Sequence, residues 1–247
     1  MRKNKMSSIV LLHYIKLVFR SLLFVPALII YIYNRVYGSG GSFGGFEQNN
    51  ILLAFIWTVF MIEMILRFFP SRFESMGCQK QFAGNFKKTD ECDVKMDSAK
   101  TTFLVAFFWL LLNGIIGIFY LAGIFDRGIM LLIALFYSVC DIICILFFCP
   151  FQTWIMKNKC CGSCRIYNWD YAMMFTPLVF VKNIYAWTLL GAALLLLMRW
   201  EFTVKLYPER FMEKTNKSLS CAECREKLCQ HKTQLRSFLK KRKNKGL

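Results

Sequence analysis

Histidine and the common catalytic fingerprints are scarce in this sequence. His13 and His231 are the two histidines among 247 residues; the first lies in an apolar stretch and the second in a basic tail. A Ser–His–Asp type of hydrolase needs a histidine beside its nucleophile. The HExxH zinc motif, the phosphate-binding P-loop and the dinucleotide-binding glycine motif are also absent. The sequence thus favours none of these enzyme classes and leaves open whether the protein is an enzyme.

Long polar segments are scarce as well. Hydrophobic residues make up 56% of the chain, and phenylalanine alone occurs 25 times. A helix that crosses a bilayer needs about 20 mostly apolar residues, because the hydrocarbon core is roughly 30 Å thick. Five stretches meet this requirement, at residues 9–33, 51–69, 102–125, 129–148 and 171–200. We therefore predict an all-α, polytopic helical membrane protein with about five transmembrane segments, located as a multi-pass protein in the cell membrane.

The predicted organisation is a transmembrane domain, 1–200, followed by a polar basic tail, 201–247. The fifth apolar stretch contains Pro177 and the pair Lys182-Asn183 near its middle. Proline removes a backbone hydrogen bond and interrupts a helix. An alternative is therefore that residues 171–181 form an interfacial or re-entrant segment before the last helix crosses.

Acidic residues are few compared with basic ones, 15 against 32, and the formal net charge is +17. In a membrane protein, such an excess of lysine and arginine first reflects topology and attraction to anionic lipid. Leu228, Leu235 and Leu239 would share one face of a helix in the tail. We expect this basic amphipathic tail to bind the anionic surface of the lipid bilayer, with a membrane protein partner as an alternative. Nucleic acid ranks second to anionic lipid as a partner of the tail, because few stacking aromatic residues are interleaved with its basic residues.

Cysteine is abundant, with eleven residues. A first group of candidate ligands lies in the two polar loops 70–101 and 150–170: Cys78, Cys92, Cys160, Cys161 and Cys164. The Cys161-x2-Cys164 spacing lets two thiolates hold one zinc ion or one iron–sulfur cluster. Because two spans separate the loops, they are expected on the same side of the membrane. Disulfides and unpaired thiols remain the alternatives.

A second group of candidate metal ligands lies in the tail, where Cys221, Cys224, Cys229 and His231 fall within eleven residues. The spacing allows zinc, although the single residue between Cys229 and His231 makes a poor second ligand pair. The alternative is a basic helix with scattered cysteines. The remaining cysteines lie in or directly after the fourth apolar stretch, where we expect them to fill space in the core. These are Cys140, Cys144 and Cys149.

Charged residues inside the apolar stretches are candidates for a functional site, because burying a charge in lipid is costly. Glu63 lies deep in the second stretch and Asp141 deep in the fourth, and Lys16, Arg20 and Lys182 are their candidate counter-charges. Two interpretations remain open. The charges form a proton or cation path, or they form ion pairs that lock helices together.

The sequence therefore predicts a membrane protein with a cysteine-rich metal or thiol site at the membrane surface. Its expected chemistry is electron relay or metal handling, with zinc or an iron–sulfur cluster as the cofactor. One alternative is a small-solute or ion transporter that uses Glu63 and Asp141. Another is a non-catalytic accessory subunit of a membrane complex.

Overall fold

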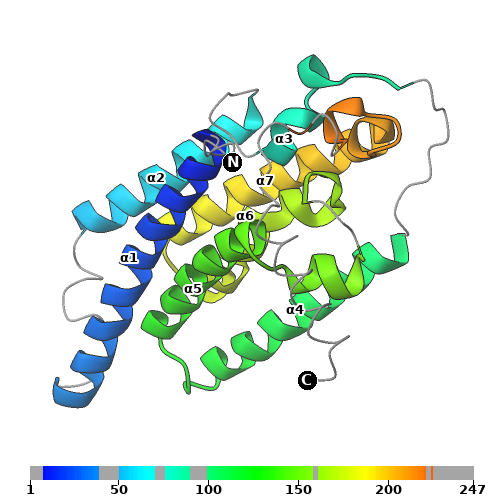
Figure 1. The fold of residues 1–247 in the computed structure, drawn as a ribbon. Helices are drawn as coiled ribbons and strands as arrows, with labels where there is room; N and C mark the ends of the chain where they lie inside the picture. Colours follow the sequence, from blue (N-terminus) through cyan, green and yellow to red (C-terminus); the bar gives the residue numbers. More distant parts are fainter. Residues whose placement is uncertain are drawn as a thin grey trace, which may run out of the picture.

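The computed structural model describes residues 8–38, 50–69, 76–89, 99–157, 161–220 and 224 as a bundle of helices (Figure 1). Within these ranges the backbone is helical or irregular and forms no β-strand, apart from one isolated bridge between Lys88 and Asn216. The all-α fold class is therefore confirmed for this part of the chain.

Of the five long helices in the described part, four coincide with apolar stretches, and the fifth overlaps the second half of the last stretch. They are α1 (Ser8–Tyr37), α2 (Asn50–Phe68), α4 (Ala99–Leu121), α5 (Arg127–Leu146) and α7 (Ile184–Leu206). Three of these contain segments long and apolar enough to cross a membrane, namely α1, Lys100–Leu121 of α4, and α5. These three helices support a membrane protein. Crossing of the membrane by α2 and α7 stays a prediction.

The fifth apolar stretch is divided into three helical pieces. A short helix α6 (Asp170–Phe175) is followed by the 3₁₀ segment η5 (Thr176–Phe180), and α7 begins only at Ile184. Pro177 lies at the start of η5, where its missing N–H costs least. Asn183 then caps α7 by accepting a hydrogen bond from the Tyr185 amide at 2.8 Å. The predicted span 171–200 is thus not one continuous helix, which agrees with the alternative in which a separate segment precedes the last helix.

A tight turn reverses the chain between α4 and α5. Gly123 has a φ of 75°, a left-handed conformation that glycine adopts readily after a helix end. Asp126 then caps α5 by accepting from the Ile129 amide at 2.9 Å. Away from this turn, α4 contacts mainly η5 and the π-helical turn η2 (Phe151–Ile155). The two helices of the hairpin are therefore not closely packed against each other.

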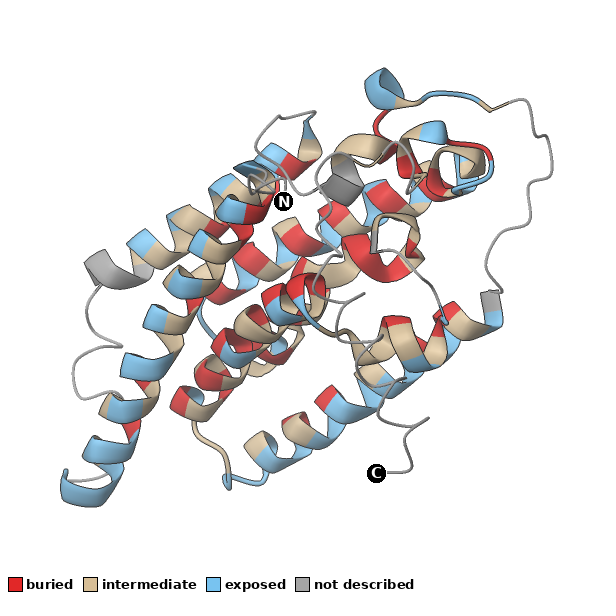
Figure 2. Ribbon diagram, viewed as in Figure 1, coloured by how far each residue is buried: buried red, intermediate tan, exposed pale blue. Residues whose placement is uncertain are grey.

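Burial differs sharply between the helices (Figure 2). Phe103, Leu110 and Leu121 of α4 are 71%, 63% and 75% exposed, whereas nine of the 20 residues of α5 and four of the six residues of α6 are buried. Large exposed apolar surfaces are rare on soluble monomers and are typical of membrane contact. The outer face of α4 is thus suited to lipid.

Short elements gather at one end of the bundle (Figure 1). They are α3 (Met76–Gln81), η1 (Ala83–Asn85), η3 (Cys161–Ser163), η4 (Arg165–Trp169), η6 (Pro208–Phe211) and η7 (Lys217–Leu219). Helix α3 contacts η3, η6 and η7. The two polar loops, expected on the same side of the membrane, therefore meet each other and the first part of the tail.

Candidate functional site

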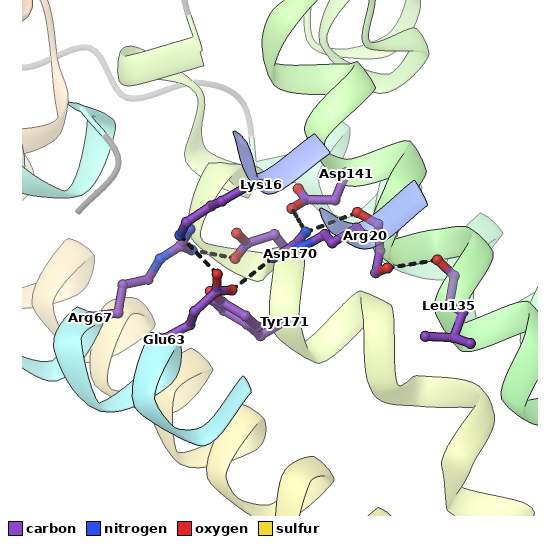
Figure 3. A network of polar contacts seen from close by, with 9 residues as sticks. Lys16, Arg20, Glu63, Arg67, Leu135, Asp141, Asp170 and Tyr171 are labelled. Carbon is purple, nitrogen blue, oxygen red and sulfur yellow. Dashed lines mark hydrogen bonds and ion pairs between the residues drawn. The ribbon is translucent and has the colours of Figure 1, made fainter. Parts of the chain in front are cut away.

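A buried arginine joins three helices of the bundle (Figure 3). The guanidinium group of Arg20, on α1, donates to Glu63 Oε2 on α2 and to Asp141 Oδ2 on α5, both at 2.9 Å. It also donates to the Ser138 carbonyl at 2.9 Å. The Arg20 side chain is 3% exposed, and each carboxylate side chain is 15% exposed. The planar fork of arginine can satisfy several acceptors at once, so one residue neutralises part of both carboxylates.

Glu63 has two further partners. Lys16, four residues before Arg20 on the same face of α1, approaches Glu63 Oε1 at 3.2 Å. The Tyr171 hydroxyl donates to Glu63 Oε2 at 2.9 Å. Lys182, predicted as another intramembrane charge, is instead exposed in the turn before α7. Glu63 and Asp141 are thus brought together by Arg20, and Lys16 also approaches Glu63, an arrangement that agrees with the ion-pair interpretation.

A second buried ion pair lies beside the first. Arg67 donates to Asp170 Oδ1 at 2.5 Å, and the two side chains are only 4% and 6% exposed. The Arg67 guanidinium also lies over the Tyr171 ring, 4.7 Å from its centroid. Burial raises the pKa of the Asp170 carboxyl to about 6, by more than the nearby Arg67 lowers it. The other carboxylate oxygen, Oδ2, is buried and has no hydrogen-bond partner among the described residues.

We call these groups together the charge network, made of Lys16, Arg20, Glu63, Arg67, Asp141, Asp170 and Tyr171. It holds three cations and three carboxylates. Sequence reasoning did not identify Arg67 and Asp170 as members of this network. The available signal was the spacing of Glu63 and Arg67, because residues four apart share one face of a helix.

The cysteines of the polar loops lie on segments held together by side-chain amides. Gln81, at the end of α3 and 1% exposed, donates to the Gly162 carbonyl at 2.8 Å. It accepts from the Asn168 side chain at 2.8 Å. Gly162 lies between Cys161 and Cys164. The α3 segment, which contains Cys78, is therefore fixed against the Cys161-x2-Cys164 turn.

The first part of the tail is attached to the same place. Asn216 is fully buried and donates to the Lys80 carbonyl at 2.9 Å and to the Arg210 carbonyl at 2.8 Å. The Lys217 amide donates to the Lys87 carbonyl at 2.8 Å. We call α3, η3, Cys164 and η7 the cysteine face. Its polar anchors, Gln81, Asn168 and Asn216, were not predicted, because nothing in a local sequence pattern distinguishes a buried amide from an exposed one.

The described residues carry only some of the predicted metal ligands. Cys164 is buried and Cys224 is half-buried, the latter packing against the main core. The backbone of Cys78 and Cys161 is described. Within the described part of the chain, no three Cys, His, Asp or Glu side chains are grouped to hold a metal ion. The part of the tail that is predicted to bind lipid lies outside the described residues. So do the other predicted ligands, which are Cys92, Cys160, Cys221, Cys229 and His231.

Cys140, Cys144 and Cys149 lie on or just after α5, and each is half-buried. His13 is buried, with Nδ1 2.8 Å from the Ile9 carbonyl of its own helix. No protein-family model, no curated protein and no solved structure matches this chain. The functional interpretation is therefore based on the residues and their geometry alone.

Proposed function

We propose that the protein is a multi-pass membrane protein that holds a zinc ion or an iron–sulfur cluster through thiolates of the cysteine face. The contact between Gln81 and Gly162 is the observation that carries this proposal. Gln81 lies three residues after Cys78 on α3, and residues three apart share one face of a helix. This spacing supports Cys78 as a candidate ligand together with the Cys161-x2-Cys164 turn.

Thiolate is the ligand that zinc and iron–sulfur clusters share, and both commonly take four ligands. Cys78, Cys161 and Cys164 are the first three candidates. Cys92, Cys160 and the tail residue Cys224 are candidates for the fourth, since Asn216 fixes the start of the tail beside Lys80. Such a centre at a membrane surface is suited to electron relay or to metal handling.

The transporter hypothesis has weaker support. A conducting carboxylate has to exchange partners, whereas Glu63 and Asp141 share Arg20 and sit in a network of balanced charge. Buried carboxylates held in this way are suited to locking α1, α2 and α5 together. A non-catalytic accessory role is compatible with such a lock and differs from our proposal in needing no metal.

Metal analysis tests the proposed function. The full chain is purified without oxygen, and zinc and iron are measured per protein together with mass analysis under non-reducing conditions. We expect bound zinc or iron in the parent protein and its loss in the double variant Cys161→Ser/Cys164→Ser. The matched control is Cys140→Ser, which removes a half-buried thiol of α5 and should keep the metal.

Two results would contradict the proposal. The first is a parent protein without zinc or iron, with Cys161 and Cys164 in disulfides or unmodified. The second is an equal metal content in the parent and the double variant. Melting curves of both variants show whether a loss of metal reflects a loss of fold.

A further inference from the structure

A cavity of about 390 Å³ lies where α4 and α5 are not packed against each other. Its walls come from α4, α5, η2, η4 and α6. This volume is within the range of small-molecule sites. Most of the lining side chains are apolar, which favours an occupant that is soluble in the membrane.

Aromatic rings form much of the cavity wall. They belong to Trp109, Phe136, Tyr137, Phe148, Phe151 and Tyr167. The rings of Trp109 and Tyr137 lie 4.7 Å apart, and those of Trp109 and Phe151 lie 6.2 Å apart. Aromatic rings interact favourably with another ring in stacked or edge-on geometry, and the sulfur atoms of Met173 and Cys140 add polarizable contacts. This lining favours a planar ring over a saturated acyl chain.

Two carboxylates of the charge network also line the cavity, Asp141 and Asp170. Arg20 already occupies one oxygen of Asp141. Asp170 is different, because its side chain is 6% exposed and its Oδ2 atom has no hydrogen-bond partner among the described residues. A buried acceptor without a partner costs free energy that a bound donor recovers. Oδ2 itself has almost no accessible surface, so an occupant with a hydrogen-bond donor would supply this partner once the Asp170 carboxylate turns toward it.

The balance of charges at the site decides whether the donor group of the occupant should be charged or neutral. The three cations of the charge network balance its three carboxylates, so a charged occupant would leave an uncompensated charge in an apolar site. A hydroxyl group donates a hydrogen bond without adding charge.

We propose that this cavity binds a neutral, membrane-soluble molecule of the hydroquinone class, with its ring among the aromatic side chains and one hydroxyl donating to Asp170. The proposal goes beyond the proposed metal function and does not depend on it. Cys164 lines the same cavity, so the ring would sit next to the cysteine face.

Binding to the full-length protein in detergent tests the proposal, with a decyl-substituted benzohydroquinone as the probe. Its dimethyl ether, which has the same ring and tail but no donor, is the comparison compound. Affinities are measured by isothermal titration calorimetry under nitrogen. We expect the hydroquinone to bind roughly ten-fold or more tightly than the ether, because a hydrogen bond to a buried carboxylate is lost in the ether.

Three variants separate the contribution of the ring to binding from that of the hydroxyl group. Cys140→Phe fills the cavity and should abolish binding of both compounds, whereas Leu121→Phe adds the same ring at an exposed site on α4 and should leave binding unchanged. Asp170→Asn should remove most of the preference for the hydroquinone over the ether. If Asp170→Asn fails to fold, the pair of phenylalanine variants still decides whether this cavity is the site.

The proposal is overturned if the ether binds as tightly as the hydroquinone, or if Cys140→Phe binds both compounds like the parent. It is also overturned if a saturated phospholipid binds as tightly as the hydroquinone and competes with it in the same titration, because the cavity would then be a site for acyl chains. Metal content is measured on the same samples, so loss of ligand binding and loss of metal are distinguished.

Discussion

The charge network and the cysteine face hold distant segments together by different chemistry. The charge network joins α1, α2, α5 and α6 through full charges, with Arg20 between Glu63 and Asp141. The cysteine face joins α3 to η3 and to the tail through neutral amides, with Gln81 and Asn216 donating to backbone carbonyls. One region matches charge with charge, and the other satisfies backbone groups of short, irregular segments.

This difference follows from what each region has to bury. Long helices satisfy their own backbone hydrogen bonds, so their polar contacts are free to be ion pairs between side chains. Short elements such as α3, η3 and η6 leave carbonyl groups without partners, and the buried amides of Gln81 and Asn216 supply the missing donors. We therefore expect the two regions to respond differently to mutation. Loss of one charge leaves an opposite charge unpaired, whereas loss of one amide leaves neutral groups unpaired.

The largest effect is expected for Arg20→Gln. The change leaves Glu63 and Asp141 without the cation that they share, and removing one member of a buried ion pair typically costs about 3–5 kcal/mol. Thermal unfolding in detergent measures the loss. Arg35→Gln, which changes an exposed arginine on the same helix, is the matched control and should be close to neutral.

A compensated variant sharpens this prediction. Neutralising all three groups, as Arg20→Gln with Glu63→Gln and Asp141→Asn, removes the unpaired charges and should recover much of the lost stability. If Arg20→Gln melts like the parent protein, or if the triple variant is less stable than the single one, the charge network is not an electrostatic lock.

A smaller effect is expected for Asn216→Ala on the cysteine face. Asn216 donates to two backbone carbonyls and accepts from the Ser218 amide at 3.1 Å. Leaving such buried neutral groups unpaired costs about 1–3 kcal/mol in typical cases. The cost should appear as faster proteolysis near η7 as well as a lower melting temperature. Asn85→Ala changes an exposed asparagine in the polar loop 70–101 and serves as the control for Asn216→Ala.

If Asn216→Ala and Asn85→Ala are cleaved at the same rate, Asn216 does not fix the tail. The support for placing Cys224 near the cysteine face would then be lost. If Asn216→Ala instead costs as much as Arg20→Gln, the contrast between charged and neutral anchors is wrong.

The parts of this structure that sequence could predict are those with a local pattern. Apolar run length predicted the approximate positions of α1, α2, α4 and α5, and Pro177 with Asn183 offered the interruption before α7 as an alternative to one span over 171–200. The cost of burying charge singled out Glu63 and Asp141, with Arg20 as one of three candidate counter-charges. The Arg67–Asp170 pair joins residues 103 positions apart, and no local pattern encodes their contact.

The amides of the cysteine face were equally hidden from sequence analysis. Gln81 and Gly162 are 81 positions apart, and glutamine in a polar loop is usually exposed. Only the packing of α3 against η3 makes Gln81 a buried anchor. The cysteine spacing predicted which residue types to consider, whereas the segments that come together depend on the fold.

The smallest effect is expected for the ion pair between Arg165 and Glu201, which lies between the two regions in character. It is charged like the charge network, with Arg165 Nη2 donating to Glu201 Oε2 at 2.7 Å, but its side chains are 22% and 30% exposed. Trp169 also donates to Glu201 Oε1 at 2.7 Å. Solvent screens partly exposed pairs, which are typically worth about 0–1 kcal/mol.

Glu201→Gln keeps an acceptor for Trp169 and removes the charge, so it should lower stability by less than about 1 kcal/mol, and by less still at high salt. Glu201→Ala, which also removes the acceptor, should cost more than Glu201→Gln at every salt concentration. A loss for Glu201→Gln as large as that for Arg20→Gln would mean that exposure does not set the strength of ion pairs in this protein, and the comparison between its buried and exposed charges would fail.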